Sequence, residues 1–164
     1  MLYVLMIFDH FKLTNKVAIV TGGTRGIGLS IAHALGEAGA KIIVTSRTDK
    51  YSGLKSLKDA NYDVSFLQGD ITDPNEPQKI INFVLEKYNS IDILVNNAGV
   101  AQHGTMEEFD DKLLDKIMNT NVDSVFRMCR SVLPQMKKQG EGAILNIGSI
   151  SGISIKYSST SSGL

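Results

Sequence analysis

Cysteine, tryptophan and proline are scarce in this chain. One cysteine, Cys129, three prolines and no tryptophan occur among its 164 residues. A lone cysteine excludes an internal disulfide framework and is typical of proteins from reducing compartments. We therefore expect a cytoplasmic protein.

An excess of charge of one sign is also missing. The 17 basic and 17 acidic residues cancel to a formal net charge of zero, and no block of like charges occurs. Binding to nucleic acid or to an anionic membrane surface needs a concentrated basic patch, so neither partner is predicted. His10 and His33 have no partner residues at ligand spacing, so no metal site is predicted either.

Long hydrophobic runs are absent too, since a bilayer-spanning helix takes about 20 apolar residues. Residues 1–8 are almost all apolar, but they lack the basic flank and the small-residue cleavage site of a signal peptide. We interpret this stretch as an extra terminal strand, or as residues added by an upstream start codon with Met6 as the usual start.

What the chain does contain is a regular alternation of short apolar runs and helical patterns. The runs predict five strands, at residues 16–21, 41–46, 64–68, 91–95 and 143–147. Between them, apolar residues recur at the helical period. Short apolar strands separated by helices are typical of a buried parallel sheet with helices on both faces. The sequence therefore predicts a doubly wound α/β fold with three layers, α/β/α, formed by one domain over residues 1–164.

Several helix boundaries are marked by capping residues. A polar helix is expected at residues 50–60. Asp73, followed by a proline and with Glu76 three positions later, is predicted to be the N-cap of the next helix. Thr105 and Glu108 have the spacing of a second capping box.

The first strand runs directly into a glycine-rich turn, residues 21–28 (TGGTRGIG), and a helix follows. Glycines let backbone amides approach a pyrophosphate, and the helix amino terminus supplies unpaired N–H groups to the anion. A plain strand–helix turn is the alternative. The position after the first strand and before an amphipathic helix favours dinucleotide binding.

The spacing T-G-x-x-x-G-I-G, the block Asn96-Asn97-Ala98-Gly99 after the fourth strand, and Asp70 after the third resemble the short-chain dehydrogenase/reductase family over about residues 12–155. The resemblance implies a Rossmann-like fold that here lacks the family's last strands and helices. It also implies a nicotinamide cofactor and interconversion of an alcohol and a carbonyl. The implied cofactor-binding residues are Gly22, Thr24, Arg25, Gly26, Ile27, Gly28, Ser46, Arg47, Asp70, Ile71, Asn97, Ala98 and Gly99.

The end of the second strand bears on the choice of cofactor. An acidic residue there binds the ribose 2′-hydroxyl of NAD(H), whereas an arginine accommodates the 2′-phosphate of NADP(H). This chain has Ser46 and Arg47 at that point, and Arg25 lies in the glycine turn. The alternative is that both arginines are solvated and that Asp49 reaches a ribose hydroxyl. We predict NADP(H) rather than NAD(H).

The resemblance also implies four catalytic residues, of which two are found. Ser149 matches the serine that orients the substrate oxygen, and Asn121 matches the asparagine that holds a water, although a solvent-facing polar residue is the alternative for Asn121. An asparagine there also predicts a local break in the helix. The catalytic tyrosine is expected about thirteen residues after the serine, in a Y-x-x-x-K pattern, where this chain has Ser162. Tyr157 and Lys156 are interpreted as loop residues.

These observations predict an oxidoreductase by family, similar to gluconate or 3-oxoacyl-carrier-protein reductases, that binds NADP(H) with little or no turnover. A premature stop, an alternative transcript and an incomplete gene model all remain open as reasons for the missing pair. The alternatives are a non-catalytic nucleotide-binding or interaction module and a truncation product without function. A methyltransferase of similar fold would explain neither the NNAG block nor Ser149 together with Asn121. A homo-oligomer is expected of full-length relatives, an expectation that we do not extend to this chain.

Overall fold

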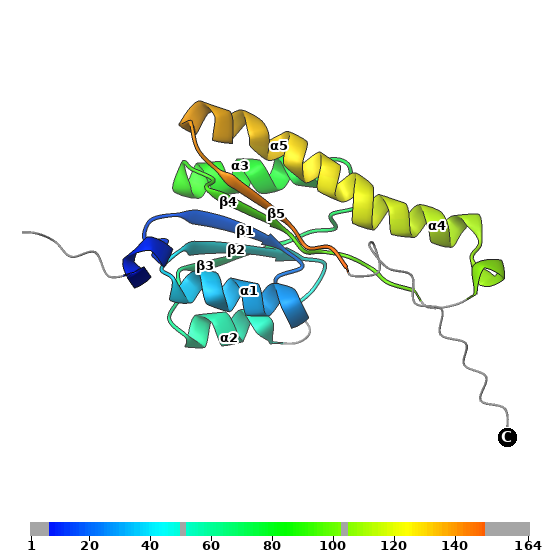
Figure 1. Cartoon of the computed structure of the whole chain (residues 1–164), viewed down its shortest axis with the longest axis horizontal. Helices are drawn as coiled ribbons and strands as arrows, with labels where there is room; N and C mark the ends of the chain where they lie inside the picture. The colour runs from blue at the N-terminus through cyan, green and yellow to red at the C-terminus, as the bar shows by residue number, and fades with distance from the viewer. Residues whose placement is uncertain (1–6, 50–51, 103–104, 150–164) are drawn as a thin grey trace, which may run out of the picture.

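The computed structural model describes residues 7–49, 52–102 and 105–149. Five parallel strands form one sheet in the order β3-β2-β1-β4-β5 (Figure 1). Their bounds are β1 Val17–Thr21, β2 Lys41–Ser46, β3 Val64–Gln68, β4 Ile93–Asn96 and β5 Ala143–Asn146. The strand order reverses direction between β1 and β4, which confirms the doubly wound topology.

Helices cover both faces of this sheet. One face carries α1 (Gly26–Glu37) and α2 (Gly53–Asp59), and the other carries α3 (Glu76–Tyr88) and α5 (Ser124–Gln139) (Figure 1). The helix α4 (Asp111–Met118) leads into α5 through the π-helix η3 (Asn119–Asp123). Two short 3-10 helices, η1 (Ile7–Phe11) and η2 (Met106–Glu108), complete the described elements.

The strands divide their side chains between two hydrophobic cores. Every residue of β1 is buried, as expected of a strand covered on both faces. Ile19 and Leu94 pack toward α3 and α5, whereas Val20 and Val95 belong to the core beneath α1 and α2. Full burial of such a side chain stabilises the fold by about 1.5–3 kcal/mol.

The start of α3 differs from the prediction at Asp73. The helix begins at Glu76 with Asn75 as its N-cap residue, and Pro77 occupies the first turn. Asp73 Oδ1 instead accepts the backbone N–H of Asn75 at 2.8 Å. A short acidic side chain competes with the helix by bonding the backbone two residues on, so it forms a turn ahead of the helix. This bond lowers the pKa of Asp73 below its ordinary value.

Only the glutamate half of the predicted capping box at Thr105 forms, because the N–H of Glu108 bonds the main-chain oxygen of Thr105 at 3.1 Å, and the motif does not open the following α-helix. The backbone N–H of Thr105 donates to Oε2 of Glu108 at 2.8 Å, around the short helix η2. The helix α4 has its own N-cap, Asp110, whose Oδ1 accepts the N–H of Leu113 at 2.8 Å. Asp110 therefore supplies the N-cap that was predicted for Thr105.

Other expectations differ at element ends or fall outside the described residues. Strand β4 lies slightly later than predicted, and β5 ends one residue earlier, at Asn146. Helix α2 begins at Gly53; residues 50 and 51, where the prediction began, are not described. The predicted extra strand is wrong for Ile7 and Phe8, which belong to η1, and its first six residues lie outside the described part.

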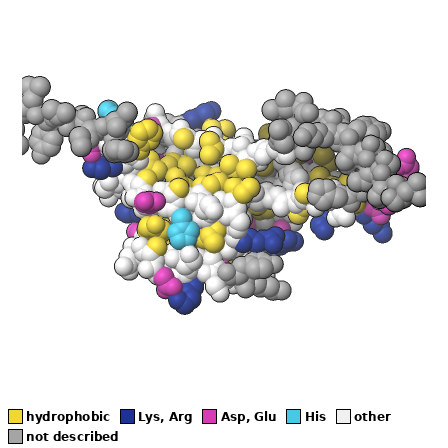
Figure 2. All heavy atoms as spheres, turned by 60° about the horizontal axis from the view of Figure 1, so that its bottom comes forward, with side chains coloured by type: hydrophobic (Ala, Val, Ile, Leu, Met, Phe, Trp, Pro, Cys, Tyr) yellow, Lys and Arg dark blue, Asp and Glu magenta, His cyan; other side chains and the backbone are white. Residues whose placement is uncertain are grey.

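Apolar side chains are exposed at the β5 edge of the sheet. Leu145 is 54% exposed and Ile147 37%, and Ala143 is also exposed. Figure 2, which brings the α1 and α2 side forward, shows hydrophobic side chains gathered across the middle of the view.

Among residues 7–49, 52–102 and 105–149, no helix has both the length and the apolar character needed to cross a bilayer.

Candidate active site

The predicted site residues, apart from Asn121, end a strand or follow its carboxyl end. β1 and β4 are adjacent, and the segments after Thr21 and Asn96 leave the sheet side by side at the point where the strand order reverses. Ligands of open parallel sheets bind at this kind of position. The ends of β2, β3 and β5 lie at the same edge because all five strands are parallel.

The glycine turn has the backbone conformation that its sequence requires. Gly22 and Gly26 have φ values of +66° and +52°, which glycine adopts without strain. The N–H of Gly22 donates to the carbonyl of Thr45 at 2.7 Å, so the turn is fastened to β2. Gly28 is buried, and a Cβ atom there would overlap the carbonyl of Gly22 and the side chain of Asn97. The turn and the first turn of α1 are thus packed too closely for any other residue at Gly28.

Thr21 and Asn97 connect the glycine turn to the NNAG block. Thr21 Oγ1 accepts the backbone N–H groups of Asn97 and Ala98, each at 3.0 Å. In return, Asn97 Nδ2 donates to the carbonyl oxygens of Thr21 at 2.9 Å and Gly22 at 3.3 Å. The two motifs form one rigid unit. Thr21 belongs to the predicted glycine-turn motif but not to the predicted site residues, although a hydroxyl at the last position of an apolar strand is a visible signal.

The amino end of α1 faces this turn. Arg25 is the N-cap residue, and its side chain makes no capping hydrogen bond to the described helix. A helix leaves four N–H groups without an intrahelical partner at its start, and these attract anions. A Cβ added at Gly26 would meet none of the described atoms within 4 Å, so the backbone is open at this point. The arrangement suits an anion such as a phosphate.

Two hydroxyl groups shape the loop after β2. Thr24 Oγ1 and Ser46 Oγ lie 3.0 Å apart, and both donate to the carbonyl of Thr48, at 3.2 Å and 2.7 Å. Arg47 lies on this loop with an exposed side chain, while its carbonyl accepts from the Gln68 side chain at 2.9 Å. Asp49, the alternative ribose ligand, has one carboxylate oxygen bonded to the N–H of Leu54 at 3.2 Å.

Asp70 organises the loop that follows β3. Its Oδ1 accepts the backbone N–H of Thr72 at 3.0 Å and the Thr72 hydroxyl at 2.8 Å. The residue is exposed, and Ile71 beside it is half-buried. Asp70 therefore fixes the backbone at the strand end where the family resemblance implies a cofactor-binding residue.

Asn121 lies in the predicted break of the long helix, which is the π-helix η3. Its Oδ1 accepts the N–H of Val100 at 2.9 Å, and its Nδ2 donates to the carbonyl of Val100 at 2.8 Å. Thr120 and Ser124 bond back to main-chain oxygens four residues earlier, a pattern that bends helices. The Asn121 amide is thus hydrogen-bonded to the loop after Gly99, while the residue itself is exposed, so the structure does not contradict its interpretation as a solvent-facing residue.

Ser149 lies three residues beyond Asn146, the last residue of β5, and is exposed. Asn146 is fastened to β4 because its Oδ1 accepts from Asn96 Nδ2 at 2.9 Å. β5 is parallel to β4, so Ser149 follows the same carboxyl edge as the other site residues. Ser162, Tyr157 and Lys156 lie outside the described residues.

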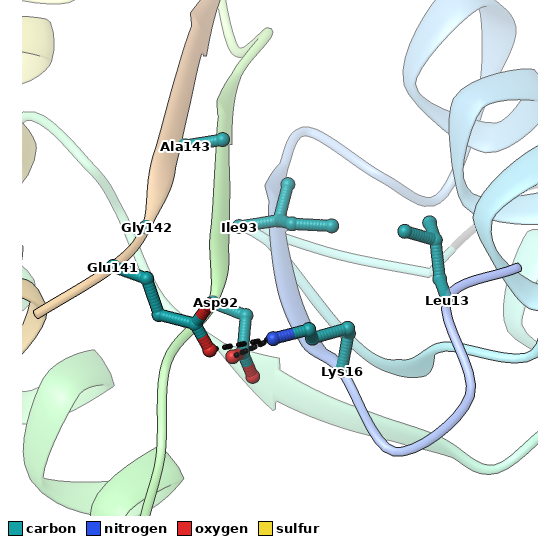
Figure 3. Close-up of a pocket in the computed structure, with 7 residues that line it drawn as sticks. All are labelled: Leu13, Lys16, Asp92, Ile93, Glu141, Gly142 and Ala143. Atoms are coloured by element: carbon teal, nitrogen blue, oxygen red, sulfur yellow. Dashed lines mark hydrogen bonds and ion pairs between the residues drawn. The ribbon is translucent and has the colours of Figure 1, made fainter. Parts of the chain in front are cut away.

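A separate charged cluster lies at the opposite, amino-terminal edge of the sheet (Figure 3). Lys16 Nζ bonds Glu141 Oε1 at 2.6 Å and Asp92 Oδ1 at 3.3 Å, and Asp92 Oδ2 accepts the N–H of Val17 at 2.8 Å. Glu141 first and Asp92 second raise the pKa of Lys16. The cluster joins the starts of β1, β4 and β5, and none of its residues was a predicted site residue. No group of three metal-ligating side chains occurs in the described part of the chain.

Comparison with known proteins agrees with this geometry. The family model described as short chain dehydrogenase matches residues 16–162. A 3-oxoacyl-acyl-carrier-protein reductase from Vibrio cholerae is 36% identical over 142 residues, which cover 86% of this chain and 57% of the reductase.

Solved structures show the same likeness. The crystal structure of gox2181 superposes with a TM-score of 0.88 at 34% identity, covering 93% of this chain and 60% of that one. A gluconate 5-dehydrogenase from Burkholderia cenocepacia, in complex with NADP and tartrate, gives a TM-score of 0.84 at 31% identity. The match covers 92% of this chain and 60% of the dehydrogenase. The chain thus spans somewhat more than half the length of these relatives. It belongs to the short-chain dehydrogenase family.

Proposed function

We propose that this chain is the NADP(H)-binding part of an oxidoreductase that interconverts an alcohol and a carbonyl, and that the 164 residues form one domain with little or no turnover of its own. The observation that carries the proposal is the Thr21–Asn97 unit at the open amino end of α1. The single cysteine supports a cytoplasmic location.

The glycine turn is assigned to the pyrophosphate of the cofactor. Gly22, Thr24 and Gly26 bring the backbone into position, and Gly28 lets α1 start close to β4. The N–H groups at the start of α1, beside Ile27, bind the negative charge of the pyrophosphate, and Arg25 is assigned together with Arg47 to the 2′-phosphate. Asp70 and Ile71 are assigned to the adenine end, and Asn97, Ala98 and Gly99 to the nicotinamide end.

Two features favour NADP(H) over NAD(H). Arg47 presents an exposed guanidinium at the end of β2, next to Ser46, and binds the 2′-phosphate with charge-assisted hydrogen bonds. Asp49 is partly committed to the N–H of Leu54, which weakens its case as a ribose ligand. The similar gluconate 5-dehydrogenase was crystallised with NADP.

The chemistry assigned to this chain is incomplete. When bound, a nicotinamide cofactor supplies or accepts the hydride. Ser149 orients the substrate oxygen at the end of β5, and Asn121 fixes the loop at Val100 beside the nicotinamide end. The tyrosine expected to move the proton is replaced by Ser162. Losing such a general acid costs about 10²–10⁴-fold in rate.

Calorimetric titration of the 164-residue chain with NADPH and with NADH tests the cofactor assignment. We expect saturable binding with a preference for NADPH of about tenfold or more, because one charge-assisted contact contributes about 1.5–3 kcal/mol. Preference for NADH, or no binding of either, would overturn it. Oxidation of NADPH with a panel of ketones tests the proposal that the chain has little or no turnover, and steady turnover would contradict that proposal.

A non-catalytic interaction module is the second candidate, favoured by the exposed side chains of Leu145 and Ile147. An exposed apolar strand edge is a surface that pairs with another chain. Under this reading the chain binds NADPH and joins a longer relative in a complex of defined mass, which light scattering on the mixture would detect. A truncation product without function would aggregate, and NADPH would not raise its melting temperature.

A further inference from the structure

The guanidinium of Arg127 spans the whole π-helix η3. Its Nη1 donates to Oδ1 of Asn119 at 2.8 Å, and its Nη2 bonds Oδ2 of Asp123 at 3.3 Å. Asn119 and Asp123 are the first and last residues of η3. The guanidinium is mostly shielded, since the Arg127 side chain is 21% exposed. The Arg127 side chain therefore connects the two ends of η3 on one side of the helix.

The same guanidinium reaches the loop after β3. Arg127 Nη1 also donates to the main-chain oxygen of Thr72 at 3.4 Å, and Asn119 Nδ2 lies 3.5 Å from that oxygen. Thr72 is the residue whose N–H and hydroxyl are held by Asp70. Arg127 thus connects η3 to the loop that Asp70 organises.

The opposite side of η3 is held by a different contact. Asn121 stands two residues after Asn119, and residues two apart lie on nearly opposite sides of a helix. On that side the Asn121 amide makes its two hydrogen bonds to Val100. The π turn is therefore fixed between the loop after β3 and the loop after β4.

We propose that Arg127 is a positioning residue, which keeps Asn121 bound to Val100 and links that contact to the Asp70–Thr72 loop. This inference rests on the proposed function, in which Asp70 marks the adenine end of the cofactor and Val100 the nicotinamide end. Arg127 itself acts only through its neighbours.

The chemistry of arginine suits this task. A guanidinium is planar and carries five N–H donors in a fixed fork, so it binds several acceptors at once. A lysine would keep the charge but offers one compact ammonium on a flexible stem. The Arg127→Lys variant should therefore retain part of the effect, and Arg127→Gln should lose nearly all of it.

Amide hydrogen exchange at Val100 tests the proposal in the unliganded chain. The Val100 N–H is protected by Asn121, so loosening of η3 exposes it. We expect exchange about fivefold faster or more in Arg127→Gln, and an intermediate rate in Arg127→Lys. Arg130→Gln, which removes an equal charge one turn along α5, should leave Val100 unchanged. Equal Val100 exchange in the wild type and Arg127→Gln would overturn the proposal.

Two checks keep the result specific. Exchange at Val44, in the core of β2, should be the same in all variants, because the effect is local. If Arg127→Gln does not fold, Asn119→Ala removes the acceptor at 2.8 Å and is expected to have the same effect on Val100.

Adenosine 2′,5′-bisphosphate, which lacks the nicotinamide, tests the link to the adenine end. It should slow Val100 exchange in the wild type and in Arg130→Gln, and much less in Arg127→Gln. Equal slowing in all three would overturn the link. If the nucleotide does not bind the wild type, the proposed cofactor is wrong, while the unliganded comparison still decides the role of Arg127.

Discussion

Asn97 and Thr21 exchange hydrogen bonds in both directions: the Thr21 hydroxyl accepts the N–H of Asn97, and the Asn97 amide donates to the Thr21 carbonyl. Each residue ends or follows a strand at the switch between β1 and β4. The pair fixes the relative position of the two segments that carry the proposed cofactor site.

Replacing Thr21 with valine tests this pair. The valine keeps the shape of the buried side chain but leaves the N–H groups of Asn97 and Ala98 without their acceptor. An unsatisfied buried donor costs about 1–3 kcal/mol, so Thr21→Val should lower the free energy of unfolding by about that amount. Urea denaturation measures it. Thr21→Ser keeps the hydroxyl and should stay close to wild type; equal stability of the valine and serine variants would contradict the prediction.

Replacing Gly28 with alanine should disturb the glycine turn. The added Cβ would overlap the Gly22 carbonyl and the Asn97 side chain, and overpacking of this kind costs about 1–3 kcal/mol. We expect lower stability in urea and weaker NADPH binding by calorimetry. Gly148→Ala is the matched control, because a Cβ there meets no described atom within 4 Å. A Gly28→Ala variant with unchanged stability would show that the turn is not tightly packed.

Replacing Lys16 with methionine should change how stability depends on pH. Glu141 and Asp92 raise the pKa of Lys16 above its ordinary 10.5, so the folded state holds this proton more tightly than the unfolded state. The contribution of protonated Lys16 to the free energy of unfolding is therefore complete below pH 10.5 and disappears as the pH rises through the raised pKa. This contribution should be below about 1 kcal/mol, because the Lys16 side chain is 39% exposed.

Chemical denaturation of wild type and Lys16→Met from neutral to strongly alkaline pH measures this difference. The two stabilities should differ at neutral pH and converge above the raised pKa. Lys55→Met, which breaks an exposed pair with Asp59, serves as control for loss of a surface ion pair. A stability difference between wild type and Lys16→Met that grows with rising pH would contradict the upward direction of the Lys16 pKa shift.

Replacing Arg47 with aspartate should reverse the cofactor preference. The carboxylate would repel the 2′-phosphate of NADPH and accept the ribose hydroxyl of NADH. NADPH affinity should fall by about tenfold or more, while NADH affinity holds or rises. Calorimetry with both cofactors provides the measurement, with Arg130→Asp on α5 as charge-matched control. Equal loss of NADPH affinity in both variants would point to general electrostatics rather than a specific contact.

The sheet was predictable because its strands are nearly continuous apolar runs. Residues such as Ile19 and Val44 are buried from both faces, and a parallel sheet requires this pattern. The glycine turn was predictable for a related reason, since the positive φ values at Gly22 and Gly26 restrict those positions to glycine. The break at Asn121 followed from the poor fit of asparagine within a helix.

What the sequence did not predict depends on tertiary contacts or on competing local ones. Lys16 and Glu141 are 125 residues apart, and Arg127 and Thr72 are 55 apart, so no local pattern connects them. Asp73 was assigned to a helix cap because its spacing fits one, but its bond to Asn75 forms a turn instead. Spacing alone does not decide which backbone N–H a side-chain acceptor bonds.

The 76-residue separation of Thr21 and Asn97 also has a consequence for folding order. Loop-closure entropy must be overcome before such a contact contributes, and the unit cannot form before β4 is available to pair with β1. The glycine turn is synthesised early, near the start of the chain, yet its geometry is completed late. Under the proposed function, a growing chain on the ribosome completes its dinucleotide site only after the fourth strand has emerged.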